Sequence, residues 1–150
     1  MTAQVRIGDP LSAEGRALLS ASQAFMASIY AADENFALTT EALAAPGVLF
    51  LIAETDDGPT GCAALVSKDG YGEIKSMFVD PAARGTGTGS QLMDALEVHA
   101  RELGLPLLRL ETGPELAAAV RLYERHGYAL RGPFGDYPDT PASLFMEKRL

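Results

Sequence analysis

The run EIKSMFVDPAARGTGTGSQLMDAL (73–96) constrains the fold most, because an apolar strand pattern passes through a glycine-rich loop directly into a helical pattern. Gly85, Gly87 and Gly89 stand at every second position of this loop. Glycine loses more conformational freedom on folding than any other residue, so this spacing indicates a backbone that a ligand must approach closely. A helix N-terminus preceded by glycines offers unpaired N–H groups and a partial positive charge to an anion. The run therefore predicts a strand, an anion-binding loop and a helix.

The rest of the chain predicts a mixed sheet flanked by helices. In the first half, apolar patterns and turn residues predict strands at 4–8, 48–54, 60–67 and 72–79, with helices at 11–30 and 39–45. The second half predicts a helix from about Gly87 to Gly104, a strand at 105–112, a helix at 114–127 that opens on Pro114, and strands at 128–132 and 143–150. Strands that first form a meander and then alternate with helices indicate an α/β (α+β) domain.

The composition limits the compartment and the partners. At 150 residues, without a linker or an internal repeat, the chain is expected to form a single domain over 1–150. Cys62 is the only cysteine, which excludes an internal disulfide and a cysteine-based zinc site. The net charge of −8 argues against a nucleic-acid partner, and it suits a cationic substrate as well as plain solubility. The start MTAQVRIGDP lacks a signal-peptide pattern, and no apolar run approaches the roughly 20 residues of a membrane span. A cytoplasmic protein without a membrane partner is expected.

Two common phosphate-binding motifs do not fit the glycine loop. A P-loop requires Gly-Lys-Ser/Thr at its end, and no lysine follows Gly89. A Rossmann fingerprint requires GxGxxG after the first strand, whereas this loop reads GxGxG after the fourth predicted strand. A third pattern, Arg/Gln-x-x-Gly-x-Gly/Ala, is met by Arg84, Gly87 and Gly89.

With this pattern the chain resembles the GNAT superfamily of N-acetyltransferases, whose pyrophosphate loop binds acetyl-coenzyme A. The resemblance extends over 47–150, where MFVDPAARGTGTG joins the strand end Val-x-Pro to the loop and LYERHGY matches the helix motif Leu-Tyr-x-x-x-Gly-Phe/Tyr. The runs EIKSMFV, LETG, LYERHGY, PFGDY and SLFMEK are similar to one uncharacterised bacterial subgroup. The resemblance implies a mixed, mostly antiparallel sheet of roughly six to seven strands flanked by about four helices. It also implies a V-shaped splay between the strands at 72–79 and 105–112.

The same resemblance implies transfer of an acetyl group from acetyl-CoA to a primary amine of a small molecule or peptide, by direct attack in a ternary complex and without a metal. The strand before the loop is then expected to pair with the pantetheine arm, the Val79 N–H to stabilise the oxyanion, and the loop backbone to cradle the pyrophosphate. Many members hold pantetheine with an asparagine where this chain has Leu116, which puts side-chain support of the cofactor in doubt. The implied cofactor-binding residues are Met77, Phe78, Val79, Arg84, Gly85, Thr86, Gly87, Thr88, Gly89 and Ser90.

Two residues are the first candidates for catalysis. Tyr123 matches the family tyrosine that acts as general acid beside the coenzyme sulfur, and its alternative role is packing on an amphipathic helix. Glu73 is the first candidate for the base, since strand periodicity predicts that it shares a face with Lys75, Met77 and Val79. The alternative for Glu73 is a surface ion pair with Lys75.

The acceptor site is expected between three segments. Glu111, at the end of the strand at 105–112, is the second candidate for the base. In the family, the segments that correspond to 30–38 and 134–137 flank the acceptor. Phe134 and Tyr137 of the second segment either wall the acceptor pocket or pack the loop against the sheet. The candidate substrate-binding residues are Glu111, Thr112, Phe134 and Tyr137. A non-catalytic acyl-CoA-binding sensor or interaction module is the alternative function, and homodimerisation is common in the family.

Overall fold

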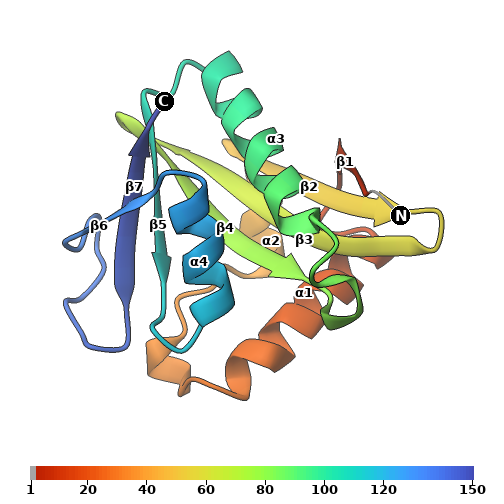
Figure 1. Ribbon diagram of the computed structural model, residues 1–150, viewed down its shortest axis with the longest axis horizontal. Helices are drawn as coiled ribbons and strands as arrows, with labels where there is room; N and C mark the ends of the chain where they lie inside the picture. Colours follow the sequence, from red (N-terminus) through yellow and green to blue (C-terminus); the bar gives the residue numbers. More distant parts are fainter. Residues whose placement is uncertain (1–2) are drawn as a thin grey trace.

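The computed structural model describes residues 3–150, whose strands form one seven-stranded open sheet in the order β1-β2-β3-β4-β5-β7-β6 (Figure 1). Every pair of neighbouring strands is antiparallel except β4 and β5, which run parallel. The predicted mixed, mostly antiparallel sheet is therefore confirmed. The strands are β1 (Gln4–Ile7), β2 (Val48–Thr55), β3 (Gly58–Lys68), β4 (Tyr71–Val79), β5 (Leu107–Thr112), β6 (Ala129–Arg131) and β7 (Leu144–Arg149).

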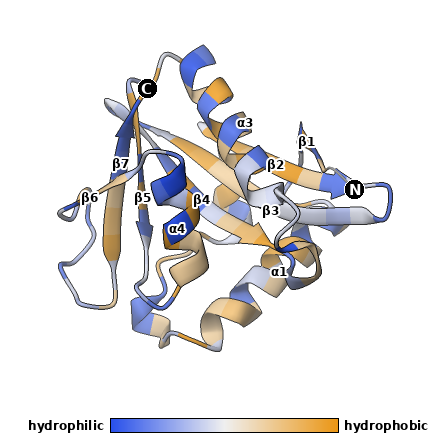
Figure 2. Cartoon of the chain, in the orientation of Figure 1, coloured by the Kyte–Doolittle hydropathy of each residue, from blue (hydrophilic) through white to orange (hydrophobic). Residues whose placement is uncertain are grey.

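Helices cover both faces of the sheet (Figure 1). They are α1 (Ala13–Ala27) and α2 (Thr40–Leu43) on one face, and α3 (Thr88–Glu102) and α4 (Ala117–Arg125) on the other. Strand β2 contributes to both layers, because Leu51 and Ala53 pack on the α3 side whereas Phe50 and Ile52 pack on the α1 side. All four are at most 2% exposed, as the unbroken apolar run predicts. In Figure 2 the hydrophobic colour follows the central strands.

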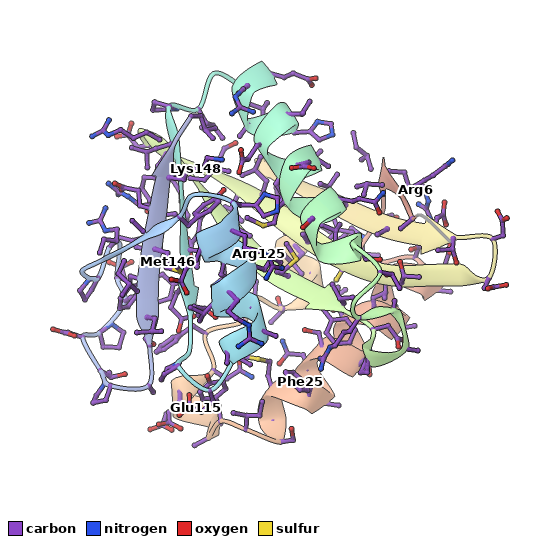
Figure 3. All side chains as sticks on the ribbon, viewed as in Figure 1. Arg6, Phe25, Glu115, Arg125, Met146 and Lys148 are labelled. Atoms are coloured by element: carbon purple, nitrogen blue, oxygen red, sulfur yellow. The ribbon has the colours of Figure 1, made fainter. Side chains whose placement is uncertain are left out.

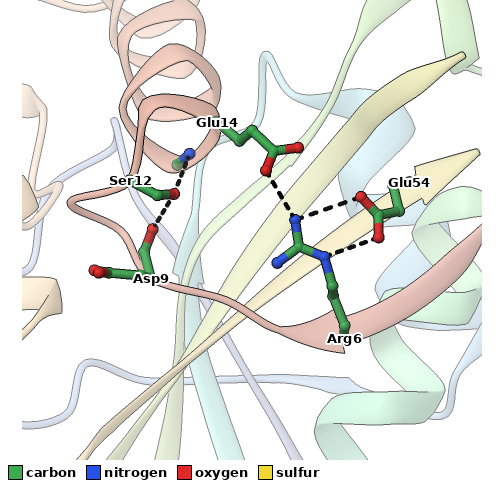
Figure 4. Close-up of polar contacts among 6 residues, drawn as sticks. Arg6, Asp9, Ser12, Glu14 and Glu54 are labelled. Carbon is green, nitrogen blue, oxygen red and sulfur yellow. Dashed lines mark hydrogen bonds and ion pairs between the residues drawn. The ribbon is translucent and has the colours of Figure 1, made fainter.

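A small polar cluster fastens β1 to the start of α1 (Figure 4). Arg6 on β1 donates to Glu54 on β2 at 2.8 Å and to Glu14 in the first turn of α1 at 3.2 Å. The Ser12 hydroxyl caps α1 by accepting a backbone N–H of the first turn at 3.1 Å, and it donates to the Asp9 carbonyl at 2.6 Å. Partly exposed ion pairs contribute little, so the cap is the stronger reason why α1 begins at Ala13 rather than at Leu11.

The helix predicted from Pro114 begins three residues later, at Ala117. The Tyr30 hydroxyl donates to Glu115 at 3.0 Å, and a Cβ added to Gly113 would collide with that hydroxyl. Glu115 lies at the lower edge of the molecule in Figure 3. The segment that follows β5 therefore turns against Tyr30 before the helix can start.

Strands β4 and β5 diverge part-way along their length. Gly72–Ile74 pairs with Leu108–Leu110, and within residues 3–150 the two strands share no further pairs. From Lys75 onward on β4 and from Glu111 onward on β5, two strand edges face each other without ladder hydrogen bonds. The predicted V-shaped splay is confirmed.

Strand β4 also contains a β-bulge at Ser76. Cys62 pairs with Phe78 and Ala64 pairs with Lys75, so two residues of β4 oppose a single residue of β3. Ser76 has a φ of 56°, in the left-handed region that is rare for residues other than glycine. The bulge shifts the side-chain alternation of β4, so residues before and after it no longer follow one period of two.

Candidate active site

Two glycines of the loop are required by its backbone conformation. The Asp80 carboxylate accepts the Ala82 N–H at 2.9 Å and starts a short 3₁₀ turn over Pro81–Ala83. Gly85 and Gly87 follow with φ values of 79° and 88°, which side-chain-bearing residues rarely adopt. A Cβ added at either position meets no atom of the described residues within 4 Å. The loop therefore needs glycine for its shape, and the space beside it is open to a ligand.

Gly87 also begins α3, and no side chain among residues 3–150 caps this helix N-terminus. The N–H groups of the first turn, which have no partner within the helix, are therefore left for a ligand at the loop. The third glycine has another role: a Cβ on Gly89 would lie 3.0 Å from Leu122, so Gly89 allows α3 to pack against α4. Arg84 lies over the ring of Phe25 on α1, at 5.2 Å from the ring centroid. An anion at this loop would meet backbone N–H groups and one guanidinium.

The open edge of β4 carries free backbone groups. The Asp80 N–H donates to the Thr60 carbonyl of β3 at 2.8 Å. Successive backbone N–H groups of a strand point to opposite edges, so the Val79 N–H points away from β3 and into the splay. Met77 lies two residues earlier on the same edge and lines the space between the strands. An extended chain could therefore add to this edge.

A cavity of about 100 Å³, here called the inner cavity, lies in the splay. It reaches both faces of the sheet, because α4 lines one side of it and α1 lines the other. Residues from both strand edges and from the segment between α1 and α2 complete the wall. The lining residues are Ser22, Gln23, Met26, Tyr30, Glu34, Asn35, Phe36, Ala37, Ile74, Lys75, Ser76, Met77, Glu111, Thr112, Gly113, Leu116, Ala119 and Tyr123.

Tyr123 on α4 lines the inner cavity although only 5% of the residue is exposed. Its ring packs against the ring of Tyr128 at a centroid distance of 6.2 Å. Within residues 3–150 its hydroxyl has no hydrogen-bond partner, and burial followed by the nearby charge of Glu111 raises its pKa above the ordinary value. Tyr123 therefore keeps its proton at neutral pH and can donate it into the cavity. Leu116, the departure from the family pattern, lines the same cavity with an apolar side chain.

Glu111 and Thr112 end β5 at the inner cavity. The Glu111 carboxylate accepts the Ser143 hydroxyl at 2.8 Å. Burial raises the pKa of Glu111, while the Ser143 hydrogen bond and the charge of Lys75 oppose the rise. A half-buried carboxylate with a raised pKa suits proton transfer near neutral pH. The structure thus brings Glu111, Thr112, Met77 and Tyr123 to one cavity.

Glu73 does not share a face with Met77 and Val79, so this part of the sequence prediction is wrong. The bulge at Ser76 separates them: Met77 and Val79 pack on the α3 side, whereas Glu73 points to the α1 side. Glu73 is 5% exposed and accepts a hydrogen bond from the Tyr137 hydroxyl. It does share a face with Lys75, whose ammonium lies 3.8 Å away, but the pair is buried rather than on the surface.

Lys75 joins this pair to the segment between α1 and α2. Its ammonium donates to the Phe36 carbonyl at 2.9 Å and to the Tyr137 hydroxyl at 2.6 Å. Burial lowers the pKa of Lys75, while the charges of Glu73 and Glu111 oppose this effect. Lys75, Tyr137 and Glu73 form one largely buried polar network, which we call the Lys75 network.

A second cavity of about 450 Å³, the outer cavity, lies beyond this network on the α1 side of the sheet. It shares Phe36, Ala37 and Lys75 with the inner cavity, so the two cavities adjoin at these residues. The rings of Phe36, Tyr71 and Tyr137 contribute aromatic walls. The lining residues are Phe36, Ala37, Leu38, Val66, Lys68, Tyr71, Glu73, Lys75, Gly135, Asp136 and Tyr137.

The two aromatic candidates of the loop after β6 have different roles. Tyr137 lines the outer cavity and takes part in the Lys75 network. Phe134 is 5% exposed and packs edge-on against Tyr71, Tyr137 and Phe145. Arg109 lies over the rings of both Tyr71 and Phe134. Phe134 therefore packs the loop onto the sheet, while Tyr137 is left facing the cavity.

The sequence predicts Lys75 only as a partner for Glu73, whereas in the structure Lys75 also lines both cavities. The alternation Glu-Ile-Lys did place both charges on one face, and this was the available signal. Within residues 3–150, no group of three His, Cys, Asp or Glu residues could hold a metal ion. Over the same residues, no helix is both long and apolar enough to span a membrane.

The sequence of this chain is similar to those of known proteins of one family. The model of the acetyltransferase (GNAT) family matches residues 16–128. An IAA acetyltransferase of Azospirillum brasilense is 44% identical over 128 residues, which cover 84% of each chain. An uncharacterized N-acetyltransferase of Bacillus subtilis, YsnE, is 37% identical over 117 residues, covering 76% of this chain and 78% of that protein.

Solved structures share the fold. A Klebsiella pneumoniae protein described as an acyl-CoA N-acyltransferase superimposes with a TM-score of 0.84 at 35% identity, over 99% of this chain and 97% of that one. The PaiA N-acetyltransferase of Thermoplasma acidophilum, solved in complex with coenzyme A, superimposes with a TM-score of 0.74 over 100% of both chains. At 16% identity the second likeness concerns the fold alone.

Proposed function

This chain belongs to the GNAT family of acetyltransferases, and on that premise we propose that it transfers the acetyl group of acetyl-CoA to the primary amine of a small molecule or peptide. Its relatives are named as an acetyltransferase, an N-acetyltransferase and an acyl-CoA N-acyltransferase, so the chain is an acyl-CoA-dependent acetyltransferase. The observation that carries the proposal is the inner cavity, whose wall includes residues of α4 on one face of the sheet and of α1 on the other. In this proposal acetyl-CoA binds on the α4 side and the amine on the α1 side.

Acetyl-CoA binds, in this proposal, along the loop and the open edge of β4. The backbone N–H groups from Arg84 to Ser90 hold the pyrophosphate, and the left-handed Gly85 and Gly87 give the loop its shape. The pantetheine arm pairs with Met77 and Val79, whose edge has no strand partner in the splay. The thioester then lies in the inner cavity beside Tyr123. In this arrangement acetyl-CoA is bound by backbone groups of the loop and of β4. Leu116 in place of an asparagine therefore does not prevent binding.

The transfer step uses groups that line the cavity. The neutral amine nitrogen attacks the thioester carbon, and the Val79 N–H stabilises the negative charge on the carbonyl oxygen. The carbon–sulfur bond breaks, and the departing thiolate takes the proton of the Tyr123 hydroxyl. The proton released by the amine passes to the Glu111 carboxylate. We place Glu111 rather than Glu73 in this role, because Glu111 shares the inner cavity with Tyr123 and Glu73 is bound to Tyr137 outside it.

Thiol release from acetyl-CoA in the presence of a panel of amines tests this function. The wild type is expected to release coenzyme A thiol with at least one class of amine. Tyr123→Phe removes one hydroxyl from a buried ring and is expected to lower kcat by roughly 100-fold or more while acetyl-CoA still binds. Tyr128→Phe is the matched control, because Tyr128 is a neighbouring buried tyrosine whose hydroxyl donates to Glu97 instead. Equal loss in both variants would contradict a catalytic role for Tyr123.

A further inference from the structure

Lys75 is a buried cation with hydrogen-bonding capacity to spare. Its side chain is 9% exposed, and an ammonium has three N–H donors. Two of them reach the Phe36 carbonyl and the Tyr137 hydroxyl. Within residues 3–150 the ammonium has no third acceptor, since Glu73 is 3.8 Å away and accepts from Tyr137. A buried donor without a partner is costly, so a ligand that supplies an acceptor there is favoured.

The cavity that Lys75 lines also contains a carboxylate of opposite sign. Lys75 and Glu111 follow the last paired residues of β4 and β5, and both line the inner cavity. Although they are neighbours across the splay, no ion pair within 4.0 Å joins them anywhere in the described chain. One cavity therefore presents a cation and an anion that are held apart and can each bind a separate group of a ligand.

We propose that the acceptor is an amine that carries a carboxylate a few bonds from its nitrogen, as a free α-amino acid does, and that Lys75 binds this carboxylate while the amine lies beside Glu111. The proposal rests on the proposed function, since it names the substrate class of the same site. The outer cavity, which adjoins at Lys75 and Phe36, then holds the remainder of the acceptor.

Charge and pairing favour this class over a simple cationic amine. A zwitterion matches both groups, whereas an amine without a carboxylate leaves one Lys75 donor unpaired inside the protein. Sites with buried polar groups reject ligands that leave these groups unpaired more strongly than they reject a small change of size. The aromatic walls Phe36, Tyr71 and Tyr137 further favour an apolar or aromatic side chain on the acceptor.

Matched acceptors test the proposal. Thiol release would be measured with several α-amino acids, phenylalanine among them, each beside its own carboxamide, which differs by lacking the negative charge. Calorimetry of acetyl-CoA binding accompanies the assay. The wild type is expected to prefer the amino acid over its carboxamide by about tenfold or more in kcat/KM, because hydrogen bonds to charged groups are worth at least this much.

In Lys75→Met, the ratio of kcat/KM for the amino acid to kcat/KM for its carboxamide should fall to about one, because the methionine side chain carries no charge to bind the carboxylate. Lys148→Met is the control: Lys148 is another partly buried lysine, but it pairs with Glu97 at 2.8 Å, and its loss should leave the preference intact. If Lys75→Met does not fold, the wild-type preference alone decides.

Two results would overturn the account at different levels. Turnover of carboxamides or other carboxylate-free amines as fast as amino acids would overturn the substrate class and leave the acetyltransferase function standing. Binding of acetyl-CoA without thiol release for any amine in the panel would overturn the proposed transfer to amines, and the substrate class with it.

Discussion

The ammonium of Lys75 lies 2.6 Å from the hydroxyl of Tyr137, which joins β4 to a loop 62 residues later in the chain. The same hydroxyl donates to Glu73, and the same ammonium donates to the Phe36 carbonyl. Three segments on the α1 side of the sheet are therefore fixed to one another by a single, largely buried network. The wall shared by the two cavities depends on this network for its shape.

Tyr137→Phe should weaken acceptor binding without affecting acetyl-CoA. The substitution keeps the ring but leaves Glu73 and Lys75 each without one partner, which costs roughly 1–3 kcal/mol of stability. We expect a higher acceptor KM, an unchanged Kd for acetyl-CoA and a lower urea midpoint. Tyr71→Phe is the control, since the Tyr71 ring also walls the outer cavity but lies outside the Lys75 network. A Tyr137→Phe enzyme with wild-type acceptor KM would contradict the positioning role.

The dependence of kcat/KM on pH should identify the base. Burial raises the pKa of Glu111, and the base must be unprotonated, so activity should rise as pH increases through that raised value. Burial also raises the pKa of Tyr123, so its loss of a proton should not lower activity near neutral pH.

Glu111→Gln should lower kcat by roughly 100-fold and remove the acidic limb of the profile that belongs to Glu111. Glu73→Gln is the matched comparison, because Glu73 lies outside the inner cavity, and this variant should retain that limb. If Glu73→Gln removes the limb and Glu111→Gln retains it, the base is Glu73 and our assignment is wrong.

The positive φ of Ser76 in the bulge should make the stability of the protein depend on which residue stands at this position. Ser76 has a φ of 56°, so Ser76→Gly should be neutral or stabilising, while Ser76→Val should cost about 1–2 kcal/mol. Urea denaturation measures both changes. Ser67→Val on β3 serves as control, because Ser67 is exposed in an ordinary strand where valine is favoured. Equal effects of valine at the two positions would show that the bulge conformation carries no strain.

Most of the fold could be predicted from the sequence. Strand periods, glycine stops and the order of elements predicted the sheet and its helices. The family resemblance predicted a splay between the strands at 72–79 and 105–112, and in the structure it begins after Ile74. The helices and strands could be predicted because each depends on a pattern within its own short stretch of sequence. The start of α4 was misplaced, because the Tyr30–Glu115 contact that delays it joins residues 85 positions apart.

The candidate site could be predicted only in part. The loop and Tyr123 belong to contiguous motifs, whereas Glu73 was placed with Met77 by assuming an uninterrupted strand. Nothing in the letters KSM marks Ser76 as a bulge, because serine is not typical of positive φ. The role of Lys75 was missed for a related reason: its contacts come from Phe36 and Tyr137, which no local pattern connects to β4.

Calorimetric titration with acetyl-CoA of the wild type, Gly87→Glu and Gly104→Glu tests the central claim most directly. Both glycines have positive φ, 88° and 75°, and an added Cβ at either meets nothing within 4 Å. They differ in place, because Gly87 opens α3 at the loop and Gly104 follows its far end. We predict that Gly104→Glu binds acetyl-CoA like the wild type and that Gly87→Glu, whose carboxylate repels the pyrophosphate, does not. Equal binding by the two variants would contradict pyrophosphate binding at this loop.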